Sequence, residues 1–405
     1  MILHLAWKNI WRNPVRSLVV IAAVVVGVWA GVSISAFSNG MTMHYLNSQL
    51  DTYVGHVSLQ TKTFNEERSA EFSLENVDSL VEFYSNDSTV KSLTPITLAD
   101  GMIASANYTS GIQIRGIDTA TDTLVFKTYQ YITKGKYLSD SFKNQIVVGE
   151  KLAEKLKSGL RSKVVLTFQR VDGTITSAAF RISGILKTPN STLDQMRIFV
   201  NREDLQKYIG GENTTHELSF RLFDANYAKT FTANHSPLLA KSDTLLNWFQ
   251  IAPELAYVDS SLDLTLYIFM GIIVLALTLG ILNTMLMAIL ERKRELGMLM
   301  AIGTSRPFLF KLIMSETLIL SCIGAPLGLF IAYLNVYFTS TYGINLSGFT
   351  EGLAMYGMGN VIYPDLKIDY IIGITSFIFI AAVLAAIYPA VKAIKLKPLE
   401  AIRQH

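Results

Sequence analysis

The chain of 405 residues contains one cysteine, Cys322, so no disulfide forms within it and no cysteine-based metal site exists. It also lacks the Gly-x-x-x-x-Gly-Lys-Ser/Thr loop that holds phosphates, the Gly-x-Ser-x-Gly elbow of hydrolases and the His-Glu-x-x-His zinc motif. The sequence therefore shows no catalytic set. We expect a non-catalytic protein with no cofactor of its own. If it depends on ATP, a partner subunit is expected to bind the ATP and magnesium.

An excess of charge of either sign is also missing. The 35 Lys and Arg residues nearly balance the 32 Asp and Glu residues, and the net charge is +3. No basic tract resembles a nucleic-acid-binding arm, so no nucleic-acid partner is expected. Half of the residues are apolar and 17% are charged, with a mean hydropathy of +0.33. This composition indicates apolar membrane segments combined with an ordinary globular domain.

Four long uncharged runs account for the apolar excess. They lie at about residues 18–37, 264–290, 317–338 and 370–391. Each is long enough to cross a bilayer, because a membrane-spanning helix needs roughly 20 apolar residues. About 220 mostly polar residues separate the first run from the second. The sequence therefore predicts an α-helical membrane protein with one span before, and three spans after, a large domain on one side of the membrane.

The predicted spans carry no Asp, Glu, Lys or Arg near their centres. Because such residues usually mark ion or proton paths, this argues against an ion-coupled transporter and a hydrophilic pore. Gly271 and Gly280 in the second span, and Gly324 and Gly328 in the third, are candidates for close helix packing. Asn283 is the most polar residue of the second span. It is expected either to hydrogen-bond across helices or to lie near the membrane surface.

Basic residues flank the spans unevenly. They cluster before the first span, between the second and third, and after the fourth, whereas the short segment 339–369 holds only Lys367. The positive-inside rule then places both termini in the cytoplasm of an inner-membrane protein, with the large domain and 339–369 outside. The predicted order is a cytoplasmic amphipathic helix at 1–16, spans at 17–38, 263–290, 312–338 and 370–391, a periplasmic domain at 39–262, a cytoplasmic coupling segment at 291–311, a periplasmic loop at 339–369 and a cytoplasmic tail at 392–405.

The exported domain is predicted to be α+β. Segments 55–60, 111–115, 163–167, 179–183 and 217–222 have the alternating or β-branched pattern of strands, and Asp172-Gly173 predicts a hairpin turn. Helices are expected at 150–157 and after Asn201, and also over 65–84 and 225–248. The histidines of this domain have no ligand spacing, so structural roles are expected for them and no metal site is predicted.

The segment after the second span is charged at its start and then has apolar residues at helical spacing. Gly303-Thr304-Ser305 ends this pattern, and Arg306-Pro307 begins the next helix. A short helix on the membrane surface suits docking to a cytoplasmic partner, although a plain surface helix with basic anchors has the same pattern.

The segment 291–303 resembles the signature of the FtsX-like permeases, in which Glu-Arg-x-Arg-Glu-x-Gly-x-x-x-Ala-x-Gly leads into the third span. The matching positions are Glu291, Arg292, Arg294, Glu295, Gly297, Ala301 and Gly303. The start of the chain at 5–13 and its end at 388–403 are also similar to that family. Segments 146–153 and 180–186 resemble its Sabre subdomain, with Porter-type segments on either side.

The resemblance implies a permease subunit of a type VII ABC transporter, which couples cytoplasmic ATP hydrolysis to movement of the periplasmic domain. It implies two ABC ATPase subunits and a second permease, identical or paralogous, with the matched residues at 291–303 in ATPase coupling. Segments 54–57, 248–255 and 282–286 look like the lipoprotein-releasing LolC/LolE branch. That branch implies lipoprotein or other lipidic cargo, moved from the inner membrane toward the outer one, and a periplasmic carrier.

One departure concerns the carrier. LolC has a longer, proline-bearing hook in the hairpin that corresponds to residues 169–179, and here that hairpin is short and has no proline. Two alternatives to lipid extraction stay open. One is MacB-like efflux of periplasmic peptides or drugs, and the other is FtsX-like signalling to a cell-wall hydrolase.

Overall fold

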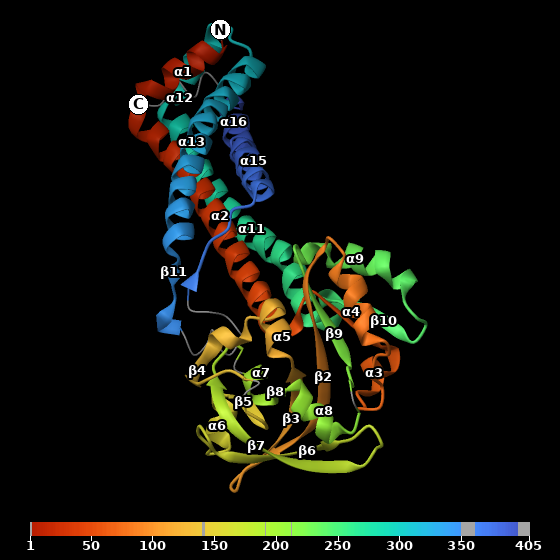
Figure 1. Cartoon of the computed structure of the whole chain (residues 1–405). Helices are drawn as coiled ribbons and strands as arrows, with labels where there is room; N and C mark the ends of the chain where they lie inside the picture. Colours follow the sequence, from red (N-terminus) through yellow and green to blue (C-terminus); the bar gives the residue numbers. More distant parts are fainter. Residues whose placement is uncertain (1, 140–141, 191, 212, 350–360, 396–405) are drawn as a thin grey trace. The chain divides into compact units, whose positions relative to one another are not determined.

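A computed structural model describes residues 2–139, 142–190, 192–211, 213–349 and 361–395 (Figure 1). The chain divides into two compact units. The helical unit comprises residues 1–42, 260–345 and 361–405, and the sheet unit comprises residues 43–259 and 346–360. The predicted tail beyond residue 395, and residues 350–360 of the predicted loop, lie outside the described residues.

The helical unit contains four helices that are long and apolar enough to cross a membrane, among the residues that the structure describes. They are formed by α2 (Pro14–Gln49), α11 (Pro253–Glu291), α13 (Arg306–Tyr342) and α15 (Ile368–Ala385), the last continued by α16 (Ile387–Ile394). The unit also contains two shorter helices, α1 (Ile2–Arg12) and α12 (Lys293–Ala301), and a two-stranded sheet of β11 (Ile344–Asn345) and β12 (Val361–Ile362). One helix before and three after the sheet unit is the arrangement predicted from the apolar runs.

Three of these helices, α2, α11 and α13, are longer than a membrane requires. The 39 residues of α11 extend about 58 Å at a rise of 1.5 Å per residue, against about 30 Å of hydrocarbon. The 36 residues of α2 extend about 54 Å. The boundary between the units falls inside both helices, at Thr42/Met43 and at Asp259/Ser260.

Glycines let α2 pack closely on its neighbours inside the helical unit. A Cβ on Gly324 of α13 would lie 2.9 Å from Cβ of Val24, and one on Gly328 would lie 2.9 Å from the carbonyl oxygen of Val25. On α2 itself, a Cβ on Gly27 would lie 2.5 Å from Leu277 of α11. The glycines remove side chains where the helices approach one another, so α2 lies at the centre of the bundle's apolar core.

The sheet unit is built on one mixed sheet, in which ten strands are found among the described residues. The order is β10-β1-β9-β2-β3-β8-β5-β7-β4, and β6 pairs with β2 and β7. The strands are β1 (Val57–Thr61), β2 (Val90–Ala104), β3 (Thr109–Ile117), β4 (Ile132–Gly135), β5 (Gln145–Gly149), β6 (Lys163–Gln169), β7 (Ile175–Leu186), β8 (Arg197–Asn201), β9 (Glu217–Leu222) and β10 (Asp243–Asn247). The helices are α3 (Lys62–Glu67), α4 (Val77–Ser85), α5 (Thr119–Val125), α6 (Glu150–Lys155), α7 (Leu193–Met196), α8 (Arg202–Ile209), α9 (Ala228–His235) and α10 (Trp248–Ile251).

The long strand β2 joins two apolar cores. Its first half pairs with β9, beside a core formed by β1, β9, β10, α4 and α9. Its second half pairs with β3 and β6, which contribute to a second core with β5, β7, β8, α6 and α8. The chain leaves the first core after β2 and returns to it at β9. The segments predicted to be Sabre-like and Porter-like thus fall on two different cores of one sheet.

Local chemistry explains most of the predicted elements. Gly173 has φ +79° in the turn between β6 and β7, a conformation that favours glycine, so the predicted hairpin is present. Asn201 accepts a hydrogen bond from the backbone N–H of Glu203 and caps α8, as its position predicts. Each predicted strand lies within, or overlaps, β1, β3, β6, β7 or β9. The predicted α+β class is confirmed.

Two predicted helices need correction. Residues 65–84 are not one helix, because α3 ends at Glu67 and α4 begins only at Val77. Residues 225–248 contain α9 but then form β10, which pairs with β1. The acidic and apolar spacing suggested helices, but tertiary pairing with an otherwise free edge of β1 makes 243–247 a strand.

Candidate functional site

The segment that resembles the family signature forms the connection between α11 and α13. The helix α11 ends at Glu291, and Arg292 has φ −94° and ψ 14°, which separates α11 from α12. The second break is Gly303, whose φ of +99° is readily adopted only by glycine. α12 is therefore a separate short helix, as the charged and apolar spacing of the segment predicts.

The acidic and basic residues of this segment are mostly paired with other helices. Glu291 forms an ion pair with Arg16 at the start of α2, and Glu295 forms one with Arg12 at the end of α1. Arg292 lies 3.5 Å from the Glu316 carboxylate of α13. These contacts join the segment 291–295 to α1, α2 and α13 within the helical unit.

A different set of α12 side chains points to solvent. Arg294 is exposed and forms no ion pair within the part of the chain that the structure describes. Met298 and Leu299 are also exposed, and Ile302, just after the helix, is 84% exposed. Ala301 and Gly303 are exposed as well, whereas Gly297 is buried against the bundle. Large exposed apolar side chains beside a free cation form a surface suited to another protein.

The predicted packing glycines fall into two groups. Gly324 and Gly328 face α2 at close range, as described above. A Cβ on Gly271 or Gly280 would meet no atom within 4 Å, so neither glycine serves helix packing within the described chain. Close helix packing by this second pair therefore stays a prediction.

Asn283 is exposed and lines a hollow of about 570 Å³ with Asn13 and Arg16, near the end of α11 that bears Glu291. Of the two readings left open for Asn283, its position favours the one at the end of the span.

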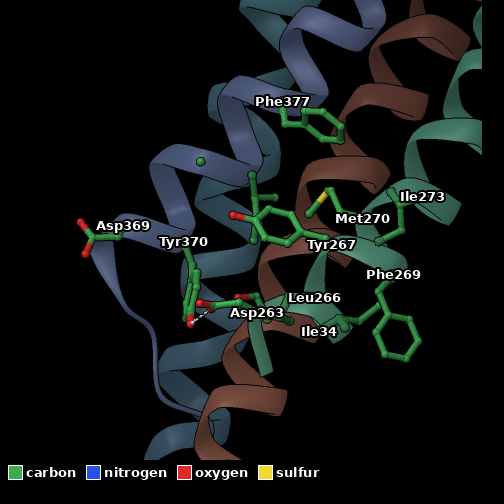
Figure 2. A pocket seen from close by; sticks show the side chains of 14 residues that line it. Ile34, Asp263, Leu266, Tyr267, Phe269, Met270, Ile273, Asp369, Tyr370 and Phe377 are labelled. Atoms are coloured by element: carbon green, nitrogen blue, oxygen red, sulfur yellow. Dashed lines mark hydrogen bonds between the residues drawn. The ribbon is translucent and has the colours of Figure 1, made fainter. Parts of the chain in front are cut away.

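The helical unit also contains an apolar pocket of about 380 Å³ between α2, α11 and α15 (Figure 2). Tyr370 donates a hydrogen bond of 2.9 Å to the Asp263 carboxylate at one edge, and Figure 2 shows the Asp369 carboxylate pointing away from the other labelled side chains. The lining residues are Gly31, Ile34, Ser35, Asp263, Leu266, Tyr267, Phe269, Met270, Ile273, Asp369, Tyr370, Gly373, Ile374 and Phe377. A concave apolar site with few polar groups at its edge is the usual form of a site for an apolar ligand.

Sequence reasoning missed this pocket and the glycine pair on α2. Gly27 and Gly31 have the four-residue spacing that lets helices approach closely, and that spacing was a usable signal. For the pocket, a weak signal was available in the two carboxylates, Asp263 and Asp369, at the starts of two apolar runs. The contact between Tyr370 and Asp263 depends on packing between helices that lie more than 100 residues apart, which the sequence does not reveal.

In the sheet unit, polar side chains contact the short helical segment Leu50–Val54, which precedes β1. The carbonyl oxygen of Tyr53 accepts hydrogen bonds of 3.3 Å from Arg115 of β3 and from Arg197 of β8. The Asp51 carboxylate lies 2.8 Å from Arg221 of β9 and 2.5 Å from Lys127. Two cations at the end of a helix are favourable because unpaired carbonyl groups concentrate negative charge there. The helix end is thus fixed to three strands.

The histidines predicted to be structural do make structural contacts. The ring nitrogens of His216 contact the backbone of Leu98 at 3.0 Å and of Ala70 at 2.9 Å. His56 accepts a hydrogen bond from the backbone N–H of Leu222, and burial lowers its pKa to about 4. No group of three His, Cys, Asp or Glu side chains suited to a metal ion occurs among the residues that the structure describes.

Asp122 is a buried acid in the same unit. One of its oxygens accepts a 3.2 Å hydrogen bond from Tyr137, and the other has no partner in the described chain. Burial raises the pKa of Asp122 to about 6, and the nearby Arg115 only partly offsets this effect. Because the native state then holds the proton more tightly than the unfolded chain, this group favours folding most below about pH 4. That contribution is lost as the pH rises through about 6.

We expect Asp122→Asn to stabilise the protein above pH 7, by about 2–3 kcal/mol from a shift of about two pH units. The amide removes the cost of a buried negative charge but keeps the shape of the side chain. Thermal unfolding of the detergent-solubilised chain from pH 5 to pH 8 measures this difference. The difference in melting temperature between Asp122→Asn and wild type should become smaller toward pH 5. Parallel melting curves across this range would contradict the expectation.

The comparison with protein families identifies both units. The MacB-like periplasmic core domain matches residues 17–233, and the FtsX-like permease C-terminal domain matches residues 267–398. The first match alone covers more than half of the chain. It spans most of the sheet unit, and the second spans the three C-terminal apolar helices.

Individual relatives are distant but cover nearly the whole chain. An uncharacterised ABC transporter permease of Methanocaldococcus jannaschii is 24% identical over 99% of this chain and 97% of its own length. The lipoprotein-releasing system transmembrane protein LolC of Neisseria meningitidis is 21% identical, over 96% and 94% respectively. The macrolide export ATP-binding/permease protein MacB of Neisseria gonorrhoeae is 20% identical over 98% of this chain but 60% of its own length.

A solved structure, the periplasmic region of MacB from Actinobacillus actinomycetemcomitans, is 16% identical, covers 52% of this chain and 97% of its own chain, and gives a TM-score of 0.36. The family assignment rests on the sequence matches, which together extend from residue 17 to residue 398. Members of this family work with cytoplasmic ABC ATPases. The chain belongs to the FtsX-like and MacB-like permease family and is a permease component of a type VII ABC transporter.

Proposed function

We propose that this permease extracts lipid-anchored or other lipidic cargo from the membrane, driven by a separate ABC ATPase. The observation that carries the proposal is the apolar pocket of about 380 Å³ between α2, α11 and α15. A pocket that opens among membrane-spanning helices, and that is lined by Leu, Ile, Met and Phe, suits an acyl chain better than a peptide or a hydrophilic drug. The match to LolC over nearly its full length supports the same reading.

The proposed topology follows the distribution of charge. Arg12, Arg16, Arg292, Arg294 and Arg306 all lie at one end of the four apolar helices. The positive-inside rule places that end, and α12 with it, in the cytoplasm. The sheet unit is then outside the membrane. In a cell with two membranes, this corresponds to an inner-membrane protein with a periplasmic domain.

The proposed ATPase contact is the exposed surface formed by Arg294, Met298, Leu299 and Ile302. This surface combines apolar side chains with one unpaired cation, which is the usual composition of a protein interface. Two ATPase subunits would bind ATP and magnesium, and a second permease, identical or paralogous, would complete the transporter. A periplasmic carrier has less support, because the β6–β7 hairpin is a tight turn at Asp172-Gly173 and has no hook.

A pair of matched substitutions tests the pocket. Gly373 lines it and a Cβ there meets no atom within 4 Å, so Gly373→Leu fills the space without a clash. Gly271→Leu is the control, since Gly271 is equally open but does not line the pocket. We expect Gly373→Leu to reduce binding and release of a fluorescent diacylated lipopeptide at least tenfold. Basal ATP hydrolysis by the assembled transporter should stay within twofold.

Equal lipopeptide release by the two leucine variants would contradict the proposal. If Gly373→Leu left lipopeptide unaffected and the transporter exported soluble peptides, the MacB-like alternative would be favoured. If neither cargo moved but a cell-wall hydrolase bound to the exported domain, the FtsX-like alternative would be favoured. Lipopeptide release, export of soluble peptides and binding of the hydrolase are all measured on the same purified transporter in lipid nanodiscs. The three proposed functions are therefore compared directly.

A further inference from the structure

Two residues of the N-terminal helix α1, Asn9 and Arg12, make three polar contacts with α13 and with the segment that begins α12. Arg12 of α1 forms an ion pair with Glu295 of α12. Asn9 of α1 donates a hydrogen bond of 2.8 Å to the Glu316 carboxylate of α13. Arg292 donates a hydrogen bond of 2.8 Å to the carbonyl oxygen of Asn9. Helices that are more than 280 residues apart in the sequence therefore share one polar network.

The centre of this network is shielded from solvent. The side chains of Arg292 and Glu316 are 14% and 15% exposed, and their charged atoms lie 3.5 Å apart. Because this pair is largely shielded from water, removal of either partner leaves a charge that water solvates only in part. The contact between Arg12 and Glu295 is about half exposed and closes the network on its solvent side. The arrangement fixes α1 against α12 at both an inner and an outer point.

The other faces of α1 indicate how the helix is held. Ala6 and Ile10 are buried in the bundle, whereas Leu3, Trp7 and Trp11 are exposed at a spacing of four residues. The rings of Trp7 and Trp11 contact each other edge to face at 5.8 Å. Tryptophan is favoured at membrane–water interfaces, so this stripe suits a helix lying in the surface of the bilayer. One face of α1 packs on protein, and another is available to lipid.

We propose that α1, α12 and the first turns of α13 move as one rigid coupling unit, with Arg12 and Glu316 as positioning residues. The inference rests on the proposed function, because it concerns how movement of α12 reaches α2. Through this network, displacement of α12 by an ATPase passes to α1, and from α1 through Asn13 directly into α2. The alternative route avoids α1 and uses the covalent links of α12 to α11 and α13, together with the ion pair between Glu291 of α11 and Arg16 of α2. The two routes differ in whether α1 is needed.

A charge exchange tests the network in the chain alone. Arg12→Glu and Glu295→Arg each place like charges opposite one another, whereas the double variant restores an opposite pair. We expect each single variant to raise hydrogen–deuterium exchange of residues 293–301 at least fivefold in detergent-solubilised protein. The double variant should return exchange to within twofold of wild type. If exchange in 293–301 were the same in all four proteins, the proposal would be wrong, whatever partner the protein has.

The assembled transporter gives the functional readout. We expect both single variants to bind the ATPase but to lose cargo-stimulated ATP hydrolysis at least threefold, and the double variant to recover it. Glu316→Gln, which keeps an acceptor for Asn9 but removes the charge that faces Arg292, should also lose stimulation. If Arg12 and Glu295 had a merely structural role, the single variants would form less complex with the ATPase. The double variant would then not restore ATP hydrolysis independently of the amount of complex.

The earlier variants break the contact between α1 and α12, and a covalent cross-link makes this contact permanent. In a Cys322→Ser background, Arg12→Cys and Glu295→Cys are joined by a short bifunctional maleimide. If α1 and α12 move together, the tied protein keeps stimulation within twofold of the untied one. Loss of stimulation in the tied protein would show that the two helices must separate, and would overturn the inference. If the wild-type protein stimulated no ATPase, the proposed function would be contradicted. The hydrogen–deuterium exchange of residues 293–301 in the chain alone would still test the present inference.

Discussion

Gly328→Leu is expected to prevent normal packing of α2 against α13 and to remove most of the folded protein. A Cβ at position 328 would lie 2.9 Å from the carbonyl oxygen of Val25 and 2.9 Å from Cβ of Val28. A backbone oxygen cannot rotate aside, so the two helices must separate along their length. Overpacking by a few methylene groups costs about 1–3 kcal/mol in protein cores, and a leucine against backbone exceeds that range.

The measurement is the fraction of monodisperse protein in size-exclusion chromatography after membrane extraction, together with the melting temperature. We expect a reduction of at least fivefold in the monodisperse fraction, because a loss of 1–2 kcal/mol already changes abundance several-fold. Gly280→Leu is the matched control, since a Cβ there meets no atom within 4 Å and the added leucine faces open space. If both variants eluted like wild type, close packing at Gly328 would not be important for folding.

Ile302→Asp is expected to abolish productive contact with the ATPase while leaving the permease folded. Ile302 is 84% exposed, so its replacement removes no buried contact within the chain. At a protein interface, loss of a central apolar side chain costs about 2 kcal/mol or more, which corresponds to roughly thirtyfold weaker binding. Burying a carboxylate there adds a further desolvation cost. Arg294→Glu is expected to act in the same direction, because Arg294 is an exposed residue of the same surface.

Co-purification of the ATPase and the ATP hydrolysis rate of the complex measure this effect. The control is Leu238→Asp, which makes the same kind of change at a 67% exposed leucine of the sheet unit. The control should retain full complex formation, and Ile302→Asp should retain the wild-type melting temperature of the permease alone. Undiminished ATPase binding by Ile302→Asp would exclude this surface as the docking site.

Sequence reasoning reached the family, the fold class and the order of the spans, but placed the interactions of single residues less well. Glu291, Arg292 and Glu295 were assigned together to ATPase coupling by resemblance. In the structure they contact Arg16, Glu316 and Arg12, while Arg294 faces outward. A motif records which residues occur together, but it does not distinguish those that hold the segment in place from those that a partner contacts.

The errors in secondary structure have a similar cause. Residues 243–247 form a strand because they pair with β1, which lies more than 180 residues earlier. Gly271 and Gly280 have the same local features as Gly328, but a Cβ on either would meet no atom within 4 Å among the described residues. Strand pairing and helix packing depend on which segments meet in space. A local pattern gives the preference of a segment but not its neighbour.

The sequence by itself determined the membrane-spanning helices, the positions of charge around them and the α+β nature of the exported domain. These follow from hydrophobic run length, charge and side-chain periodicity, which are local properties. Only the tertiary structure decided that α1 is joined to α12, that Gly27 and Gly31 face neighbouring helices, and that a pocket opens between α2, α11 and α15. These features arise where side chains from distant segments meet, and the geometry of those meetings is set by the packing of the whole bundle.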